Sequence, residues 1–506
     1  MQSRQASAWK MRKQHCGHSG QLRWLFWGMA QLAQLRAAHH CRFPQVAALQ
    51  ALAPIISHKT DFDRSCFKVK DRGTSMKYHL FLAAAALGLP SLAGAQIVNP
   101  NPGVVDSGFR LKFEDRGNNT SVRERARPEY DPAGMRIGSF MLRPTLDLEV
   151  FSTDNVLRSQ ANEKQATGTI IRPKFRLNSN WSNHSLEVYG GLSRTDVPDN
   201  DSESVGEVEF GASGQLDIQR GSNLQAAVRY FSGREPRGSI GTIADTVEPI
   251  EYDELSGTVA GIWEVNRIRA SARVDMSRLN YQDGLLRSGG VANQDDRDRT
   301  TNSFTLRSDY ALSPSFALFA QYSWDTRDYK AVSAPFVSRN SKGETGLAGA
   351  NFDLGNLARG EIGIGYIKQN YDAPVYGDTD GFGYRAAVEW FPSPRLTIGA
   401  TASRSVEDSA VAGSGGALNS GLGLQFDYEL SRNIILTAKS TSMEAEYTGF
   451  GRTDRRVAHS FTGAYLLNRN AALSASAVKN ELYSSGPRSG PEYAEWRFWL
   501  RLALRM

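Results

Sequence analysis

The feature that most constrains the fold is a period-two alternation of apolar and polar side chains, which dominates the sequence from about residue 137 onward. The last stretch is a clean example. Every second residue from Trp496 to Met506 is apolar, and the opposite set includes Arg497, Arg501 and Arg505. Side chains of a β-strand point alternately to its two faces, so this period predicts strands whose faces meet different surroundings.

Each alternating run predicts one strand. The runs number eighteen, with sixteen as the alternative, since boundaries read from a pattern shift by about two to four residues. The predicted strands cover 137–153, 166–181, 184–195, 203–218, 223–232, 251–263, 267–281, 299–312, 316–328, 341–353, 357–370, 380–391, 395–406, 418–430, 434–446, 454–467, 471–482 and 493–506.

The connections between these runs alternate in length. Short links such as Ser182-Asn183 and 392–394 are followed by longer ones such as 233–250 and 282–298, which are rich in Gly, Asp, Ser and Arg. Short periplasmic turns opposite long extracellular loops are typical of transmembrane barrels with an even strand number. A soluble sandwich or propeller is the alternative, and it has no reason to sort its loops in this way.

A closed sheet also explains how such a chain can cross a membrane. No stretch beyond Ala95 approaches the roughly 18 consecutive apolar residues of a membrane helix. In hydrocarbon every unpaired backbone N–H or C=O costs several kcal/mol, so a spanning sheet must leave no open edge. We therefore predict an all-β fold, a transmembrane antiparallel β-barrel over residues 137–506.

The segment before the barrel divides into three parts. Met76 is a second possible start, because Lys77, an apolar run and Leu92-Ala93-Gly94-Ala95 form a secretory signal over 76–95, cleaved between Ala95 and Gln96. Residues 1–75 would then be a mis-assigned extension of the gene. The alternative is a genuine cytoplasmic or anchoring extension. Residues 96–136 are rich in Gly, Asn, Pro and charge, and we interpret them as a largely flexible periplasmic segment.

Dividing the composition at Ala95 changes what the charge implies. Residues 1–95 contain 13 of the 59 lysines and arginines but only 3 of the 53 acidic residues, so the remainder has 46 basic and 50 acidic side chains. The exported part is then near −4 rather than +6, which removes the support for nucleic-acid binding. Cys16, Cys41 and Cys66 all precede Ala95, so disulfides and cysteine metal sites are excluded from the exported part.

Residues 127–159 and 171–188 carry a recognisable motif. It has a Pro-Xaa-Tyr-Asp-Pro-Xaa-Gly lead-in, a first strand containing Pro144, an Asp-Asn pair, and a hairpin with Ser179, Asn180, Trp181 and His184. This pattern resembles a family of outer-membrane β-barrel porins that is common in alphaproteobacteria. The matching motif residues are Pro128, Tyr130, Asp131, Pro132, Gly134, Asp154, Asn155 and Trp181.

This resemblance implies an outer-membrane location and an association with exopolysaccharide or capsule synthesis and export. One departure concerns the final residue. Outer-membrane barrels usually end in an aromatic residue that the assembly machinery reads, whereas this chain ends in Met506, with Phe498 and Trp499 further in. The terminal assembly signal is therefore weaker than usual.

Charged residues on the polar faces of the strands are the candidates for lining a pore. Mixed arginine and carboxylate walls polarise a channel and can bind sugar hydroxyls or acidic polysaccharide groups. The alternative is that these charges only solvate and brace the lumen. The candidates are Arg172, Lys174, Arg176, Arg267, Arg269, Arg273, Asp275, Arg307, Asp309, Arg385, Glu389, Arg497 and Arg501.

Catalytic and metal signals are weak. Only His184 and His459 remain after Ala95, and they fall on separate hairpins, so they predict neither a Ser/His hydrolase nor a metal site. His184 is better explained as a hydrogen-bonded interfacial residue, and His459 as part of an outer face. The acidic group Asp295, Asp296 and Asp298 could bind a divalent cation, but an ordinary solvated loop is favoured.

Two further patterns fit the barrel. Gly363-Ile364-Gly365 is a weak nucleotide signal, and small residues inside a strand are better explained by close packing and curvature. Aromatic residues suit girdles at the two membrane interfaces. These are Tyr310, Tyr322, Trp324, Trp390 and Trp496.

The sequence thus predicts an outer-membrane channel, porin-like and tied to exopolysaccharide export, that is not an enzyme and needs no cofactor. The alternatives are a structural or adhesive barrel with binding loops and, third, a barrel hydrolase. The expected partners are outer-membrane lipid and lipopolysaccharide, the barrel assembly machinery, and polysaccharide or its export proteins; nucleic acid is not expected.

Overall fold

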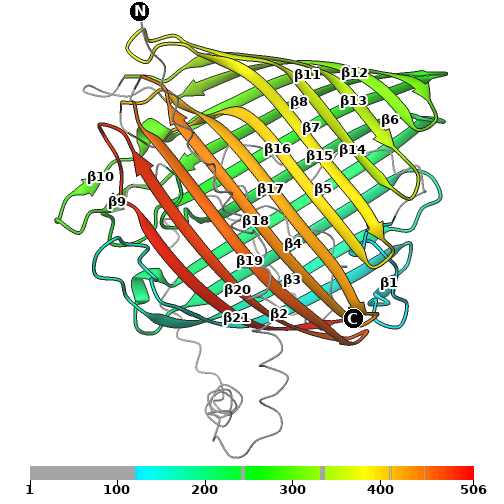
Figure 1. Cartoon of the computed structure of the whole chain (residues 1–506), viewed down its shortest axis with the longest axis horizontal. Coiled ribbons are helices and arrows are strands. Elements are labelled where there is room, and N and C mark those ends of the chain that lie inside the picture. Colours follow the sequence, from blue (N-terminus) through cyan, green and yellow to red (C-terminus); the bar gives the residue numbers. More distant parts are fainter. Residues whose placement is uncertain (1–119, 241–244, 331–336, 410, 412, 450) are drawn as a thin grey trace, which may run out of the picture. The chain divides into compact units, whose positions relative to one another are not determined.

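A computed structural model describes residues 120–240, 245–330, 337–409, 411, 413–449 and 451–506. The expected leader and the Ala95–Gln96 cleavage site lie outside these residues. Within them the chain forms one large antiparallel sheet that closes on itself as a barrel (Figure 1). The described part also contains no helix long and apolar enough to cross a membrane.

Eighteen long strands make up the barrel wall, so the predicted count is confirmed. They are β2 (Phe140–Thr153), β3 (Ala166–Ser179), β4 (Ser185–Asp196), β5 (Val205–Gln219), β6 (Ser222–Arg234), β7 (Glu251–Val265), β8 (Ile268–Tyr281), β11 (Arg299–Ser313), β12 (Phe316–Tyr329), β13 (Ser341–Asp353), β14 (Ala358–Tyr371), β15 (Thr379–Ser393), β16 (Leu396–Asp408), β17 (Gly416–Ser431), β18 (Ile434–Tyr447), β19 (Thr453–Asn468), β20 (Ala471–Ser485) and β21 (Tyr493–Arg505).

The barrel closes because the first wall strand pairs with the last. β2 and β21 are antiparallel neighbours, with Thr145 opposite Arg505 at one end of the ladder and Thr153 opposite Arg497 at the other. Every other wall strand pairs with the strands before and after it in the sequence. The closed ladder leaves no free edge, as a bilayer requires.

Short strands and single-turn helices lie at the ends of the barrel. β1 (Met135–Ile137) folds back on the start of β2, so the predicted strand 137–153 is interrupted at Gly138, whose φ of +60° suits glycine. In the long connections lie η1 (Asp201–Glu203), η2 (Asp295–Arg297) and a two-stranded ribbon of β9 (Gly284–Leu285) and β10 (Val291–Ala292). We call the end of the barrel with short connections, such as 394–395 and 432–433, the short-turn end. The opposite end, with the connections 235–250 and 282–298, is the long-loop end.

The two faces of the wall differ as the alternation predicts. Large apolar side chains such as Val150, Phe210, Ile364 and Leu422 are exposed on the outer face, where lipid replaces water. The five expected girdle aromatics are also exposed. Tyr310 and Trp390 lie near the short-turn end, and Tyr322, Trp324 and Trp496 lie toward the long-loop end.

Glycines allow neighbouring strands to approach closely in β13 and β14. A Cβ added to Gly365 would lie 1.8 Å from the Gly346 carbonyl oxygen, and one added to Gly349 would lie 2.0 Å from that of Ile362. The Gly363-Ile364-Gly365 sequence therefore serves close backbone packing inside β14, as expected from its place in an alternating run.

Candidate functional site: the lumen of the barrel

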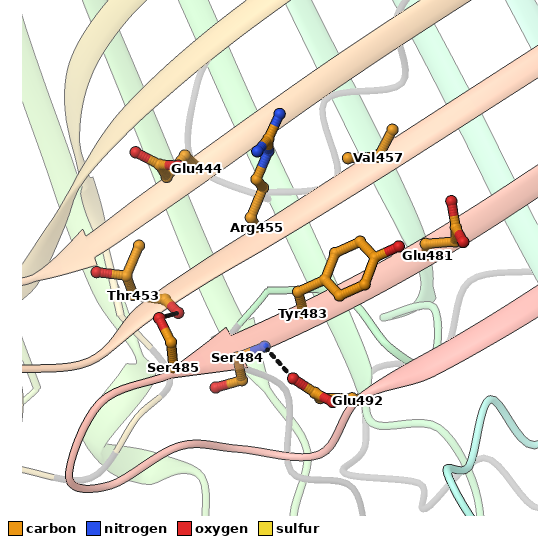
Figure 2. A pocket seen from close by; sticks show the side chains of 9 residues that line it. All are labelled: Glu444, Thr453, Arg455, Val457, Glu481, Tyr483, Ser484, Ser485 and Glu492. Carbon is orange, nitrogen blue, oxygen red and sulfur yellow. Dashed lines mark hydrogen bonds between the residues drawn. The ribbon is translucent and has the colours of Figure 1, made fainter. Parts of the chain in front are cut away.

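One hollow of about 550 Å³ lies on the outside of the barrel, near the long-loop end (Figure 2). Its charged lining residues Glu444, Arg455 and Glu481 fall on the outer face, because their registers alternate with the inward Met443, Arg456 and Leu482. This hollow is separate from the lumen, so the inner face is the better candidate for a functional site.

The inward face is identified by contacts that cross between non-neighbouring strands. Arg307 on β11 reaches Glu361 on β14, and Tyr329 on β12 reaches Asp408 on β16. Following the registers around the barrel from these residues places ten of the pore-lining candidates on the same face. They are Arg172, Lys174, Arg176, Arg269, Arg273, Arg307, Arg385, Glu389, Arg497 and Arg501.

Most of the inward arginines are held by carboxylates. Arg307 is the most completely held, since its guanidinium lies 2.7 Å from both Asp309 and Glu361. It also stacks on the Phe319 ring, with its guanidinium carbon 4.0 Å from the ring centroid. Such a side chain is braced from several directions.

The same arrangement recurs around the wall. In each case the nitrogen–oxygen distance is short enough for a charge-assisted hydrogen bond. The pairs are Arg172–Glu149 (2.6 Å), Arg501–Asp147 (2.6 Å), Arg273–Asp275 (2.6 Å), Arg229–Glu209 (2.7 Å), Arg359–Glu389 (2.6 Å) and Arg497–Glu495 (2.5 Å).

Three of the inward cations named as pore-lining candidates differ from this pattern. Lys174 and Arg385 have no hydrogen-bond or ion-pair partner within the described part of the chain, and both are exposed to the lumen. Arg176 is half exposed and has only a 3.4 Å contact with Glu187. These side chains remain available to solutes in the lumen.

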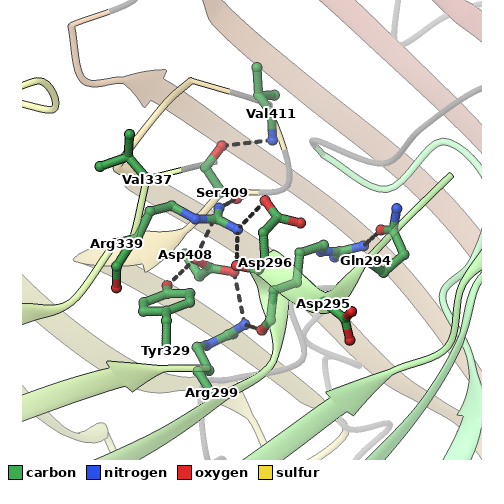
Figure 3. Close-up of polar contacts among 12 residues, drawn as sticks. Gln294, Asp295, Asp296, Arg299, Tyr329, Val337, Arg339, Asp408, Ser409 and Val411 are labelled. Carbon is green, nitrogen blue, oxygen red and sulfur yellow. Dashed lines mark hydrogen bonds and ion pairs between the residues drawn. The ribbon is translucent and has the colours of Figure 1, made fainter. Parts of the chain in front are cut away.

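At the long-loop end a network of ion pairs joins strands that are not neighbours (Figure 3). Asp408, the last residue of β16, accepts a 2.8 Å contact from Arg299 and lies 3.6 Å from Arg339. The Tyr329 hydroxyl also donates to Asp408. Because β13, β14 and β15 separate β12 from β16, these contacts bridge the barrel opening. We call Arg299, Tyr329, Arg339 and Asp408 the long-loop network.

Two arginines extend this network into the loops. Arg339 donates to the Asp296 carboxylate at 3.0 Å, and Arg297 lies 2.8 Å from Glu235 and 3.9 Å from the centroid of the Tyr281 ring. Burial by itself lowers the pKa of the Arg297 guanidinium, but Glu235, Tyr281 and Asp408 together outweigh burial and the net shift is upward. The ion pair of Arg297 and Glu235 therefore holds the loops together.

The part of the β6–β7 loop that carries Gly238 and Ile240 lies across the lumen. Ile240 packs with Ala417, Ala445, Tyr447, Leu482 and Tyr493, which belong to β17, β18, β20 and β21. The Tyr493 hydroxyl donates to the Gly238 carbonyl at 3.2 Å. Since β2 to β5 separate β6 from β21, this loop must pass over the interior to reach that wall.

At the short-turn end the residues before β1 line the inside of the wall. Arg123 lies 2.8 Å from Asp427, and both Arg125 and Arg127 contact Glu429, at 2.7 and 3.0 Å. Ser121, Val122 and Arg127 are buried. Residues 121–131 are therefore held against the inner wall. The available sequence signal was the cluster of Arg123, Arg125 and Arg127, whose charge is opposite to that of Asp427 and Glu429 on β17.

Three of the motif residues contact β21, at the two ends of its seam with β2. The Asp154 carboxylate accepts from the Trp496 N–H at 2.8 Å, and the Asn155 side chain, which is fully buried, donates to the Ala494 carbonyl at 3.0 Å. The Gly134 N–H donates to the Met506 carbonyl at 3.1 Å. At the adjacent turn Trp181 stacks edge-on with Phe140. The contacts of Gly134, Asp154 and Asn155 thus join β21 to the residues next to β2.

The two histidines lie where the sequence placed them. His184 sits in the β3–β4 turn with φ +63°, where its N–H donates to the Asp217 carboxylate at 2.9 Å and its Nδ1 accepts the Asp217 N–H at 3.0 Å. His459 is exposed on the outer face of β19. No group of three or more potential metal-binding side chains occurs in the described ranges.

The prediction of a solvated acidic loop at Asp295–Asp298 is wrong in part. Asp298 is buried and accepts the Tyr281 N–H at 2.7 Å. Asp295 lies 2.7 Å from the Lys330 ammonium, and that hydrogen bond lowers the pKa of Asp295. With Asp296 held by Arg339, these carboxylates anchor the loop to its neighbours.

Comparison with protein families gives one assignment. The sequence model of a family described as "Putative beta-barrel porin 2" matches residues 127–506. None of the curated proteins matches the chain.

Among solved structures the chain is similar to several outer-membrane proteins at low identity. OccAB3 of Acinetobacter baumannii is 10% identical over 72% of this chain and 99% of its own, with a TM-score of 0.41. The outer-membrane protein opdK of Pseudomonas aeruginosa is 11% identical over 72% and 98%, with a TM-score of 0.39. A BenF-like porin of Pseudomonas fluorescens Pf-5 is 11% identical over 73% and 100%, with a TM-score of 0.40.

Proposed function

The chain belongs to the family described as "Putative beta-barrel porin 2", and we propose that it is the outer-membrane passage for carbohydrate chains in exopolysaccharide export. It is a porin-like β-barrel channel of the outer membrane. The export role rests on the motif at residues 127–159 and on the chemistry of the inner wall.

The observation that carries the proposal is the wall of alternating guanidinium and carboxylate groups. Arg229, Arg307 and Arg359 each lie on the inner face within 2.7 Å of a carboxylate. Planar guanidinium and carboxylate groups offer many donors and acceptors at fixed positions, which suits the hydroxyls of a sugar chain. Solute passes along such a wall without any one strong binding step.

Two measurements test the proposal together. Purified protein in a planar bilayer is expected to give ion conductance, and a deletion strain is expected to secrete less polysaccharide, with recovery when the gene is returned. Absence of conductance together with unchanged secretion contradicts the proposal. Conductance with unchanged secretion keeps the channel and removes the export role.

A structural or adhesive barrel is the second candidate function. The supporting observation is that the long-loop network and the crossing β6–β7 loop tie the loops over the opening. In that case deletions in the loops 235–250 or 282–298 abolish surface binding and leave permeability unchanged. In the channel case the same deletions raise conductance.

We also propose which molecules the barrel contacts in the outer membrane. Its apolar outer face contacts lipid and lipopolysaccharide, and the barrel assembly machinery inserts it. The third hypothesis, a hydrolase, requires that His184→Ala removes an activity at normal expression. The two backbone-linked contacts with Asp217 instead favour a role for His184 in fixing the turn.

A further inference from the structure

Three cations lie side by side on the inner wall near the short-turn end. Arg143 on β2 is directly opposite Arg176 on β3, and Lys174 is two residues away on the same face of β3. Directly opposed residues have Cβ atoms about 5 Å apart, and residues i and i+2 of a strand lie about 7 Å apart. We call Arg143, Lys174 and Arg176 the basic patch.

The side chains of the basic patch make few hydrogen bonds or ion pairs with the rest of the described chain. Among the described residues, the Arg143 side chain donates to the Asn178 amide oxygen alone, at 3.2 Å, and Arg176 has only the 3.4 Å contact with Glu187. Lys174 makes no hydrogen bond or ion pair with the residues the structure describes, and Gly191 opposite it leaves room for its stem. Like charges placed opposite each other destabilise a sheet, so stability alone does not explain this arrangement.

The nearest carboxylates do not neutralise the patch. Asp147 and Glu149, further along β2, lie 2.6 Å from Arg501 and Arg172 respectively. Glu187 also accepts from Asn178, at 2.6 Å. Glu207 on β5 interacts with Lys174 electrostatically but forms no ion pair with it in the described part of the barrel.

A fourth cation, Arg505, is buried next to the patch. Arg505 on β21 is opposite Thr145, which is itself opposite Lys174. Arg505 is 5% exposed, and its Nε has no hydrogen-bond partner among the described residues. Its guanidinium interacts electrostatically with Asp131 and Asp147 but forms no ion pair with either, so it adds to the positive potential at this part of the wall.

From these observations we propose that the basic patch is a binding site for acidic saccharide units, whose carboxylates are captured at the short-turn mouth of the lumen. Two guanidinium groups and one ammonium, on side chains whose Cβ atoms lie within about 7 Å of a neighbour, offer several cations to successive carboxylates of a uronate chain. The proposal rests on the carbohydrate-channel function above and specifies its substrate class.

Isothermal titration of the detergent-solubilised barrel with trigalacturonate tests the site, with neutral maltotriose and inorganic phosphate at equal ionic strength as probes. Lys174→Gln is expected to weaken trigalacturonate binding roughly ten-fold, the loss typical of a charge-assisted hydrogen bond. The triple variant Arg143→Gln/Lys174→Gln/Arg176→Gln is expected to abolish it. Maltotriose is expected to bind neither protein.

Arg385→Gln on β15 is the matched control. Arg385 is also inward, exposed and without an ion-pair partner within the described ranges, but seven strands of the barrel separate β15 from β3 on the shorter way round. Charges beyond a Debye length of about 8 Å are largely screened, so its loss is expected to change binding less than about two-fold. Heat-modifiable migration in gels verifies that each variant is folded.

The outcomes separate this proposal from the channel function. Equal weakening by Lys174→Gln and Arg385→Gln overturns the site, and so does phosphate binding as tightly as trigalacturonate. Conductance without trigalacturonate binding overturns the site and keeps the channel. Binding that depends on Lys174 in a barrel without conductance keeps the site and overturns the channel.

Discussion

The long-loop network and the basic patch use the same kind of side chain in opposite ways. In the network Arg299 and Arg339 are buried and share one carboxylate, Asp408. In the patch Lys174 and Arg176 are exposed, and like charges face one another across two strands. Buried charges must be paired to be tolerated, whereas exposed charges cost little when left unpaired. Pairing and burial, rather than residue type, therefore separate the cations that hold the structure together from those that are available to solutes in the lumen.

The sharpest test of this contrast is Asp408→Asn. The substitution leaves two buried guanidinium groups without their shared carboxylate, and loss of one partner from a buried ion pair costs about 3–5 kcal/mol. We expect a lower midpoint in urea unfolding from lipid vesicles and faster proteolysis of the loop 282–298. Asp328→Asn, at an exposed outward position nearby, is the control and should leave both unchanged. Equal effects of the two substitutions would contradict the importance of the network.

A comparison of two inward arginines extends the test to the wall. Arg307→Gln leaves Asp309 and Glu361 facing each other, so we expect a destabilisation of about 2–3 kcal/mol. Arg176→Gln removes a half-exposed side chain with one long contact and should stay within about 0.5 kcal/mol. Urea unfolding of the two variants side by side measures the difference. Similar losses in both would remove the distinction between paired and available cations.

The loop that crosses the lumen provides a third test. Gly238 has φ +65°, and an added Cβ would lie 2.3 Å from the Tyr493 ring. We expect Gly238→Ala to displace the loop, at a cost of about 1–3 kcal/mol, and to raise single-channel conductance. Gly289→Ala is the control, because Gly289 has φ +90° but nothing within 4 Å of an added Cβ. Unchanged conductance in Gly238→Ala would show that the loop does not limit passage.

The smallest expected effect concerns the exposed pair of Asp295 and Lys330. The hydrogen bond from Lys330 lowers the pKa of Asp295 below its usual 3.8. Because the pKa of Asp295 is lower in the folded state than in the unfolded state, the charged carboxylate stabilises the loop at any pH above its unfolded-state pKa. This stabilisation is lost as the pH falls through the folded-state pKa. Pepsin cleavage of the loop 282–298 should therefore rise below pH 3.8, and Asp295→Asn should remove that pH dependence.

The alternation was sufficient to predict the wall. The predicted strand 341–353 matches β13 residue for residue, and most others differ by one to three residues at an end. The exception is the start of β2, where Gly138 turns the chain and separates β1. Alternation says which face a residue occupies, but it does not show where a glycine with positive φ reverses the chain.

The pairing of charges could not be predicted in the same way. Arg299 and Asp408 are 109 positions apart and lie on strands that are not neighbours, so no local pattern connects them. The crossing loop was missed because irregular segments carry no periodic signal. The sequence placed Lys174, Arg176 and Arg385 on the polar face of their strands, but only the contacts distinguish them from Arg307.

The seam between β2 and β21 sets an order of events during biogenesis. Its side-chain contacts join residues up to 342 positions apart in the sequence, as between Asp154 and Trp496. The entropic cost of joining chain ends grows with their separation, and contacts between distant residues form slowly. Closure is therefore expected to be the last step of insertion, and until β21 pairs with it the edge of β2 is open to pairing with other chains. The contacts of Asp154 and Asn155 with β21 then hold the closed edge together.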